Sequence, residues 1–226
     1  MSSPKKYAVI VAGGKGERMQ SAVPKQFLPL LEKPVLYYSV KAFVDAFDDI
    51  EIILVLPAEW ISYCNQVLSQ FPDRLNLTII QGGATRFHSV KNGLAETIPG
   101  SVIFVHDAVR PLVSAALIHR CYETALQTGS AVPAIEAVDS FRTVNGQGNA
   151  ALDRTRLRVI QTPQTFTYEV LIPAFEQPYD VLFTDEASVV ERAGAAITLV
   201  QGEEWNLKIT RPVDLAIAEA IIQFNP

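Results

Sequence analysis

The sequence predicts an α/β protein in which a mostly parallel, doubly wound sheet carries helices on both faces. Short apolar runs of strand length alternate with segments of helical periodicity, which is typical of this Rossmann-like class. The first apolar run, residues 7–12, leads directly into a glycine-rich loop. The chain has 226 residues, 49% of them hydrophobic, enough for one large domain with a sizeable core. We therefore expect a single domain over residues 1–226.

The alternation can be followed along the first 135 residues. Apolar residues recur at helical spacing after Pro34, which predicts a helix over residues 35–47. Ser114 is a suitable N-cap for a helix that runs to Gln127. Two more helices are expected over residues 59–71 and 85–95, and the strands after the first one are expected at residues 50–56, 77–81, 102–106 and 129–135.

The rhythm changes between residues 136 and 161, where little helical periodicity remains. Residues 140–144 alternate in polarity and Asn145-Gly146 is a strong hairpin signal. We therefore expect a β-arm over residues 136–161 that projects from the sheet. The α/β pattern then returns, with helices expected near residues 168–176, 185–193 and 212–223 and strands at 196–201 and 207–210.

Composition narrows the class of protein. The net charge of −5 argues against broad nucleic-acid binding, which usually requires a basic surface. The polar start and the shortness of every apolar run argue against a signal peptide or a membrane span. Cys64 and Cys121 lack metal or redox spacing and are expected to be buried, reduced thiols. These features suit a cytoplasmic protein with neither a nucleic-acid nor a membrane partner.

The loop after the first strand combines glycines with two cations: Gly13, Gly14, Gly16, Arg18 and Lys25. Glycines let backbone N–H groups approach an anion. The spacing differs from a dinucleotide turn, because Met19 stands where a third glycine would be, and it differs from a P-loop. The loop therefore suits a nucleoside triphosphate better than a dinucleotide. A tight turn with two surface cations is the simpler alternative.

Asp107 follows the strand expected at residues 102–106, at the edge where open α/β sheets bind ligands. A carboxylate there is a natural Mg²⁺ ligand, because Mg²⁺ prefers oxygen and bridges phosphates. An ordinary loop or N-cap carboxylate is the alternative. Arg110, three residues on, could grip a substrate phosphate or neutralise Asp107.

Several motifs along the chain, taken together, carry a resemblance to a known family. They are Gly13-Gly14-x-Gly16-x-Arg18-Met19, Pro24-Lys25-Gln26, Gln81-Gly82-Gly83 with Arg86 and Ser89, His106-Asp107-Ala108-Val109-Arg110-Pro111, Gln161-Thr162-Pro163-Gln164, Thr184-Asp185-Glu186-Ala187-Ser188, and Asn206-Leu207-Lys208-Ile209-Thr210-Arg211-Pro212. In this order they resemble the 2-C-methyl-D-erythritol 4-phosphate cytidylyltransferases, over nearly the whole chain. The resemblance implies a fold of the nucleotide-diphospho-sugar transferase type and transfer of CMP from CTP to that polyol phosphate, in the non-mevalonate isoprenoid pathway.

Such a transfer asks for cations and a divalent metal rather than a nucleophilic side chain, because the protein must align two anions and stabilise growing charge. The resemblance assigns the stabilising role to Arg18 and Lys25, and the Mg²⁺ ion to Asp107. It assigns nucleotide binding to Ala12, Gly13, Gly14, Gly16, Gly82, Gly83 and Ser89. Arg86 could serve the triphosphate or cap its helix, and Asp185 and Glu186 are expected to cap the next helix and line the site.

The second substrate is expected to lie between two subunits. The resemblance implies a homodimer in which the arm of one subunit completes the partner's site, with Arg154 gripping the polyol phosphate. The expected substrate-positioning residues are Arg110, Ser140, Arg154, Thr162 and Lys208. Ser140 stands where many family members carry threonine, and it keeps the hydroxyl. Arg156 and Arg158 are expected to be solvated arm charges.

Three alternatives remain at this point. A pentitol-phosphate cytidylyltransferase, such as a ribitol 5-phosphate enzyme, resembles this chain in the glycine loop, the segment from His106 to Pro111 and Gln161-Thr162-Pro163-Gln164. The Thr184-Asp185-Glu186-Ala187-Ser188 segment favours methylerythritol. A non-catalytic nucleotide sensor is disfavoured by the joint retention of Arg18, Lys25, Asp107 and Lys208. A dehydrogenase is disfavoured because no acidic residue follows the second strand to hold a ribose.

Overall fold

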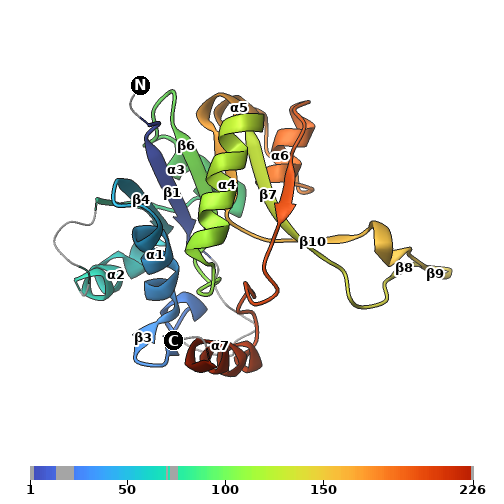
Figure 1. Cartoon of the computed structure of the whole chain (residues 1–226), viewed down its shortest axis with the longest axis horizontal. Helices are drawn as coiled ribbons and strands as arrows, with labels where there is room; N and C mark the ends of the chain where they lie inside the picture. Colours follow the sequence, from blue (N-terminus) through green and yellow to red (C-terminus); the bar gives the residue numbers. More distant parts are fainter. Residues whose placement is uncertain (1–2, 14–22, 70, 72–75, 225–226) are drawn as a thin grey trace.

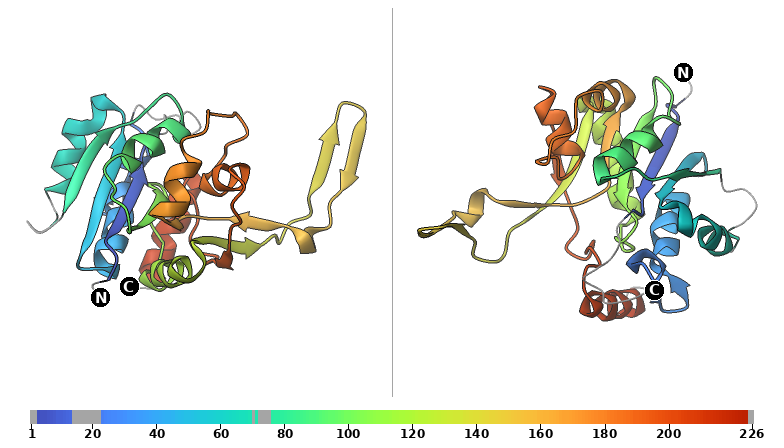
Figure 2. Two further views of the ribbon diagram at one scale, coloured as in Figure 1. Left: turned by 90° about the horizontal axis from the view of Figure 1, so that it is seen from above. Right: turned by 180° about the vertical axis from the view of Figure 1, so that it is seen from behind.

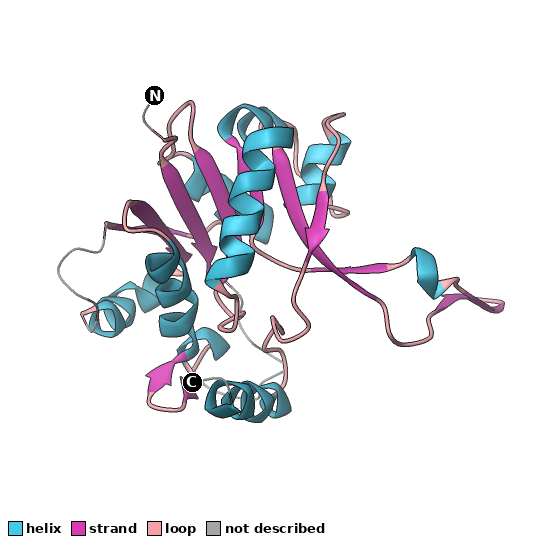
Figure 3. Ribbon diagram, in the orientation of Figure 1, coloured by secondary structure: helices cyan, strands magenta, loops and turns pink. Residues whose placement is uncertain are grey.

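A computed structural model describes residues 3–13, 23–69, 71 and 76–224 of the chain. Its centre is a sheet with the strand order β10-β7-β11-β6-β1-β4-β5, and β12 pairs with β7 (Figures 1 and 3). β1 runs parallel to both β4 and β6, whereas β10 and β11 are antiparallel to their neighbours. The expected α/β class with a mostly parallel sheet is confirmed. The strands are β1 (Lys6–Val11), β4 (Ile50–Leu56), β5 (Leu77–Gln81), β6 (Val102–Asp107), β7 (Ser130–Glu136), β10 (Arg158–Ile160), β11 (Gln164–Thr167) and β12 (Leu199–Gln201).

The sheet is buried on both faces, because alternate side chains of each strand point to opposite sides. In β1, Ala8 and Ile10 pack into one core cluster while Tyr7 and Val9 pack into the other. The first cluster is covered by α1 (Val35–Ala46), α2 (Ile61–Leu68) and α4 (Ala115–Thr128). The second is covered by α3 (Arg86–Leu94), α5 (Tyr168–Ala174) and α6 (Glu186–Arg192). Helices thus lie on both faces, as expected (Figure 1).

Helix ends follow local capping chemistry. The Ser114 hydroxyl accepts a 3.0 Å hydrogen bond from the Leu117 N–H, which confirms the expected N-cap of α4. Asp185 caps α6 through a reciprocal capping box with Ser188. The helix expected over residues 59–71 is shorter than predicted: a 3-10 turn, η3 (Ala58–Trp60), precedes α2.

In a third cluster, α7 (Pro212–Phe224) packs on the short strand β2 (Pro29–Leu30), which pairs with β3 (Lys33–Pro34). The strand expected at residues 207–210 is wrong, because this segment is irregular in the structure. The Asp214 carboxylate accepts the Thr210 and Arg211 N–H groups at 2.7 and 2.8 Å. These two N–H groups are therefore bonded to the first turn of α7 and do not pair with a neighbouring β-strand.

The segment between β7 and β10 projects from the body, as the left view of Figure 2 shows. Arg158 pairs opposite Glu136, so the two strands form an antiparallel stalk. The stalk carries η4 (Arg154–Arg156) and a hairpin of β8 (Arg142–Asn145) and β9 (Gly148–Ala151). Asn145 pairs opposite Gly148, which confirms the predicted turn. Within the described ranges, no helix is long and apolar enough to cross a membrane.

Candidate active site

The candidate site lies at the carboxyl edge of the parallel strands. β1, β4, β5 and β6 all end there, and the order of crossovers reverses between β1 and β6. This reversal is where open α/β sheets place ligands. Ala12 and Gly13 follow β1 at this point, and Asp107 is the last residue of β6. The predicted nucleotide and metal residues of these two strands are therefore neighbours.

The turn after β5 is built by two glycines and a serine. The Ser89 hydroxyl accepts a 3.1 Å bond from the Gly83 N–H and donates a 2.9 Å bond to the Thr85 carbonyl. A Cβ at Gly83 would lie 2.5 Å from the His88 Cβ and 2.9 Å from its carbonyl carbon, so the turn requires glycine there. Ser89 therefore fixes the shape of the turn, while the Gly82 and Gly83 backbone borders the site.

Lys25 is carried by a 3-10 turn, η2 (Lys25–Phe27), that the core holds in place. The Gln26 amide donates a 2.5 Å bond to the Ala12 carbonyl, and Phe27 stacks on Trp60 at 5.2 Å between ring centroids. The Lys25 ammonium donates a 3.1 Å bond to the Ile209 carbonyl. Segments 184 residues apart are thereby joined beside the end of β1.

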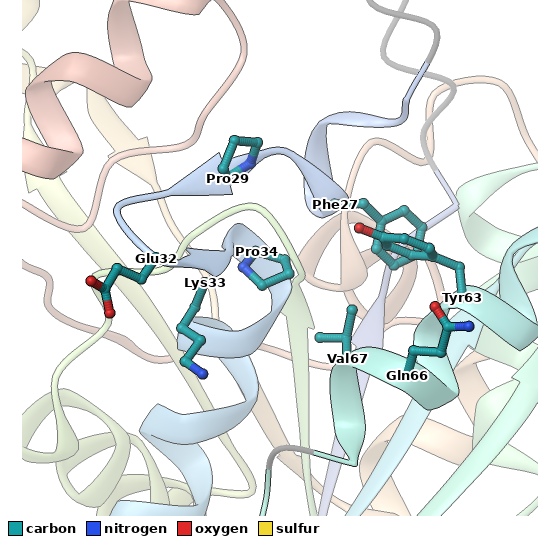
Figure 4. Close-up of a pocket in the computed structure, with 8 residues that line it drawn as sticks. All are labelled: Phe27, Pro29, Glu32, Lys33, Pro34, Tyr63, Gln66 and Val67. Carbon is teal, nitrogen blue, oxygen red and sulfur yellow. The ribbon is translucent and has the colours of Figure 1, made fainter.

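The Phe27 ring also lines a pocket of about 470 Å³, which is shown in Figure 4. Phe27, Tyr63 and Pro34 give it an apolar wall, and Glu32 and Lys33 stand at its border. Of the predicted nucleotide- and substrate-binding residues that the structure describes, none lines this pocket. We therefore place the candidate site at the sheet edge and not in this pocket.

Asp107 is the electrostatic centre of the site, with three cations around its buried carboxylate. Lys208 Nζ lies 2.8 Å from Oδ2 and Arg110 Nε lies 3.6 Å from the same oxygen. Arg86 Nη2 lies 3.3 Å from Oδ1. Burial alone would raise the pKa of Asp107, but the charges of the three cations outweigh it and hold the pKa well below its usual range. Asp107 is therefore ionised at neutral pH.

Arg86 bridges Asp107 to a second buried carboxylate, Glu186 at the start of α6. Its Nη1 lies 2.5 Å from Glu186 Oε1 and its Nη2 lies 3.1 Å from Oε2. Burial raises the pKa of Glu186, and the charge of Arg86 opposes this rise. Asp185 and Glu186 were both expected to cap α6 and line the site. In the structure Asp185 caps α6, whereas Glu186 binds Arg86.

His106 and Thr162 support the backbone of Asp107. His106 Nε2 lies 3.2 Å from the Arg110 carbonyl, which can only accept, so Nε2 carries the hydrogen and Nδ1 accepts from the Thr162 hydroxyl at 3.0 Å. The same hydroxyl accepts the Asp107 N–H at 3.1 Å. Burial lowers the pKa of His106 to about 4, so the ring is neutral at pH 7. The Thr162 hydroxyl hydrogen is therefore committed to His106 and not to a substrate.

Asn206 is a site residue to which sequence reasoning assigned no role. It is fully buried, donates a 2.9 Å bond to the Thr162 carbonyl and accepts a 2.8 Å bond from Arg110 through its own carbonyl. The sequence could have pointed to Asn206 because it lies two residues before Lys208, in the same motif. Asn206 holds that segment against the end of β6.

The predicted site residues fall into three groups. The sheet edge gathers Ala12, Gly13, Lys25, Gly82, Gly83, Ser89, Asp107, Arg110, Thr162 and Lys208. Ser140 and Arg154 belong instead to the arm that projects from the body in Figure 2. Both are exposed, and Arg154 Nη1 donates a 2.6 Å hydrogen bond to the Val138 carbonyl. Gly14, Gly16 and Arg18 lie outside the described residues.

The donors at the sheet edge fit one mode of metal binding. Among the residues that the structure describes, no group of three or more His, Cys, Asp or Glu side chains could hold a metal ion. One ionised carboxylate, Asp107, faces a cluster of cations suited to phosphates. This set suits Mg²⁺ held jointly by one carboxylate and the phosphates of a substrate, which is how Mg²⁺ usually binds.

The model of the family described as 2-C-methyl-D-erythritol 4-phosphate cytidylyltransferase matches residues 7–224. The chain belongs to this family. The protein of that name from Bacteroides thetaiotaomicron is 43% identical over 96% of this chain and 100% of its own length. Its namesake from Phocaeicola vulgatus is 43% identical over 96% of this chain and 99% of its own length.

A solved structure of the 2-C-methyl-D-erythritol 4-phosphate cytidylyltransferase from Francisella tularensis has a TM-score of 0.78 and 30% identity, covering 96% of this chain and 99% of that one. Membership confirms the family expected from the motifs, and with it an enzyme of the cytidylyltransferase class. The pentitol-phosphate and sensor alternatives are not favoured.

Proposed function

We propose that this chain transfers a cytidylyl group from CTP to the phosphate of 2-C-methyl-D-erythritol 4-phosphate at the carboxyl edge of its sheet. A phosphate oxygen of the polyol forms a bond to the α-phosphorus of CTP, the bond to the β-phosphate breaks, and pyrophosphate leaves. The observation that carries the proposal is the ring of Lys208, Arg86 and Arg110 around Asp107, beside the end of β1. Family membership supplies the substrates.

Each group at the edge has a physical task in this transfer. The backbone of Gly82 and Gly83 reads the cytosine, and the loop of Gly13, Gly14 and Gly16 binds phosphates through N–H groups. Arg18 and Lys25 stabilise the charge that grows on the α-phosphate. Lys208 and Arg110 hold the acceptor phosphate close to Asp107.

Mg²⁺ is the proposed cofactor, with Asp107 as its protein ligand and CTP phosphates as its other ligands. When bound, it supplies charge neutralisation and alignment of the phosphates. Thr162 and His106 hold the Asp107 backbone in the required place.

We further propose a homodimer in which each arm completes the partner's site. All residues of β8 and β9 are exposed in the single chain, with Val144 81% exposed, and a two-stranded hairpin is marginally stable alone. Arg154 lies in η4 and Ser140 between β7 and β8, so both belong to this arm, which projects from the body in Figure 2. A second copy would cover the arm and receive these two residues beside its Asp107.

Two remaining features belong to the same proposal. Residues 1–226 form a single domain with the arm as an extension, and the protein works in the cytoplasm. The buried free thiols of Cys64 and Cys121 suit a reducing compartment.

Pyrophosphate release tests the reaction. The assay contains CTP and Mg²⁺ and is run in parallel with methylerythritol 4-phosphate and ribitol 5-phosphate. We expect turnover with the first acceptor alone. Turnover with ribitol phosphate would move the chain to polyol activation, and silence with both in folded protein would contradict the catalytic proposal.

Mixing two impaired variants, assayed at an acceptor concentration well below the KM, tests the exchange of arms. Lys208→Ala damages the body and Arg154→Ala damages the arm. After the two dimers exchange subunits, about a quarter of wild-type activity should return, because half of the dimers are mixed and each mixed dimer has one intact site. No recovery after exchange, shown by differently tagged subunits, would mean that each arm serves its own body.

A further inference from the structure

Glu186 is a buried carboxylate for which the sequence predicted helix capping and a place in the lining of the site, but no task in binding or catalysis. It is 1% exposed and begins α6, on the face of the sheet covered by α3 and α5. Its partner Arg86 begins α3, 100 residues earlier in the chain. Burying an ionised carboxylate costs free energy unless it is paired and hydrogen-bonded. The position therefore calls for an explanation beyond packing.

Donor counting shows what Arg86 can do. A guanidinium has five N–H groups. Nε and one N–H of Nη2 point at Asp107 Oδ1, while one N–H of Nη1 and the other of Nη2 point at Glu186. One N–H of Nη1 remains. Arg86 can therefore not grip a phosphate with two donors unless it releases a carboxylate.

The two carboxylates do not share Arg86 equally. The contacts with Glu186 are 2.5 and 3.1 Å long, whereas those with Asp107 are 3.4 and 3.3 Å. The guanidinium thus lies closer to Glu186. If Glu186 were neutral, the attraction of Asp107 would act without this opposition, and the fork would be free to close on Asp107 with two short bonds.

We propose that Glu186 is a positioning residue that draws Arg86 back from Asp107 and so keeps Oδ1 available to a divalent cation. This inference rests on the proposed function, because it assumes that Asp107 shares the cation with the CTP phosphates. Glu186 touches neither substrate nor metal. It acts through Arg86, and it sets how strongly a protein cation competes for the carboxylate oxygen.

The test is Mn²⁺ binding to the protein in the presence of saturating CTP, followed by electron paramagnetic resonance. Glu186→Gln should raise the dissociation constant for Mn²⁺ about tenfold, in the range seen when a residue that orients a metal ligand is changed. The Mg²⁺ concentration needed for half-maximal turnover should rise in parallel, while kcat at saturating Mg²⁺ stays within about threefold of wild type. Glu191→Gln, on the exposed side of the same helix, is the matched control.

Arg86→Gln separates positioning from general structural damage. Removing the competing cation should leave Mn²⁺ binding as tight as in wild type or tighter, whereas loss of packing would weaken it in both variants. In the double variant Arg86→Gln, Glu186→Gln, the effect of the second change should vanish, as expected for residues that act as one unit. If Glu186→Gln alone does not fold, Arg86→Gln carries the test, and weaker Mn²⁺ binding in that variant than in wild type would contradict the inference.

Two results would overturn the inference: a wild-type Mn²⁺ constant in Glu186→Gln, or weakened binding in the double variant. Failure of the proposed function looks different, because the wild-type protein itself would then bind no Mn²⁺ with CTP and release no pyrophosphate.

Discussion

The carboxyl edge of the sheet and the projecting arm are built on opposite principles. At the edge, Asp107 ends a strand in which every residue is buried, and its carboxylate is surrounded by fixed partners. On the arm, every residue of β8 and β9 is exposed. The side chains at the edge are held in place by the buried core beneath them, whereas the strands of the arm contain no buried residue.

This difference separates the residues that one chain positions from those that, in the proposed dimer, act on a second chain. The cations at the edge are positioned before any ligand arrives, which lowers the cost of reorganisation during the reaction. On the arm, Arg154 and Ser140 are exposed, and Arg154 bonds to a carbonyl of the arm itself, at Val138. We therefore expect variants at the edge to act on the chemical step, and variants on the arm to act on acceptor binding and subunit association.

The largest expected contrast concerns stability. Phe104 in β6 is 0% exposed and packs 5.6 Å from Phe43, centroid to centroid, so Phe104→Ala should lower the free energy of unfolding by about 3–5 kcal/mol. Val144→Ala on the arm should change it by less than about 0.5 kcal/mol. Urea unfolding at several protein concentrations measures both. An effect of Val144→Ala that depends on concentration would identify a subunit contact.

Lys25→Ala tests the edge as a preformed catalytic surface. We expect kcat to fall about 100- to 1000-fold with little change in the KM for CTP, because Lys25 would act on charge that appears only in the transition state. The same direction is expected for Arg18→Ala. Steady-state kinetics at saturating acceptor measures the effect. Unchanged turnover in either variant would remove that residue from the proposed role.

Arg154→Ala tests the arm and has the smallest expected effect. Loss of a charged hydrogen-bond donor should raise the KM for the polyol phosphate about tenfold and leave the KM for CTP nearly unchanged. Arg156→Ala, an exposed cation two residues away, is the matched control and should behave as wild type. An equal rise in both KM values would mean that the arm supports the whole site structurally.

Much of the body could be predicted because its signals are local. The strand bounds of β4 and β5 match the expectation, since apolar runs end at Pro57 and at the glycines after Gln81. β11 was missed because the segment Gln164–Thr167 is short and three of its four residues are polar. Its partners, β6 and β7, decide its conformation.

The sequence predicted which residues belong to the candidate site better than it predicted which of them contact one another. Motifs located Asp107, Arg110 and Lys208, yet the bond between Arg86 and Glu186 joins residues 100 apart and depends on how α3 and α6 pack on one face. The direction of the Thr162 hydroxyl depends on the tautomer of His106, which only the Arg110 carbonyl reveals. Such pairings arise from tertiary structure and leave no local pattern.

The stalk of the arm has a consequence for how this protein can change. Because Glu136 and Arg158 stand opposite each other on one rung, the arm leaves and rejoins the sheet at the same place. Everything beyond that rung is an insertion, and its length and sequence can vary without displacing the strand ends. Shortening the arm to a tight turn would therefore leave the strands of the body in place and remove only the residues that the arm carries.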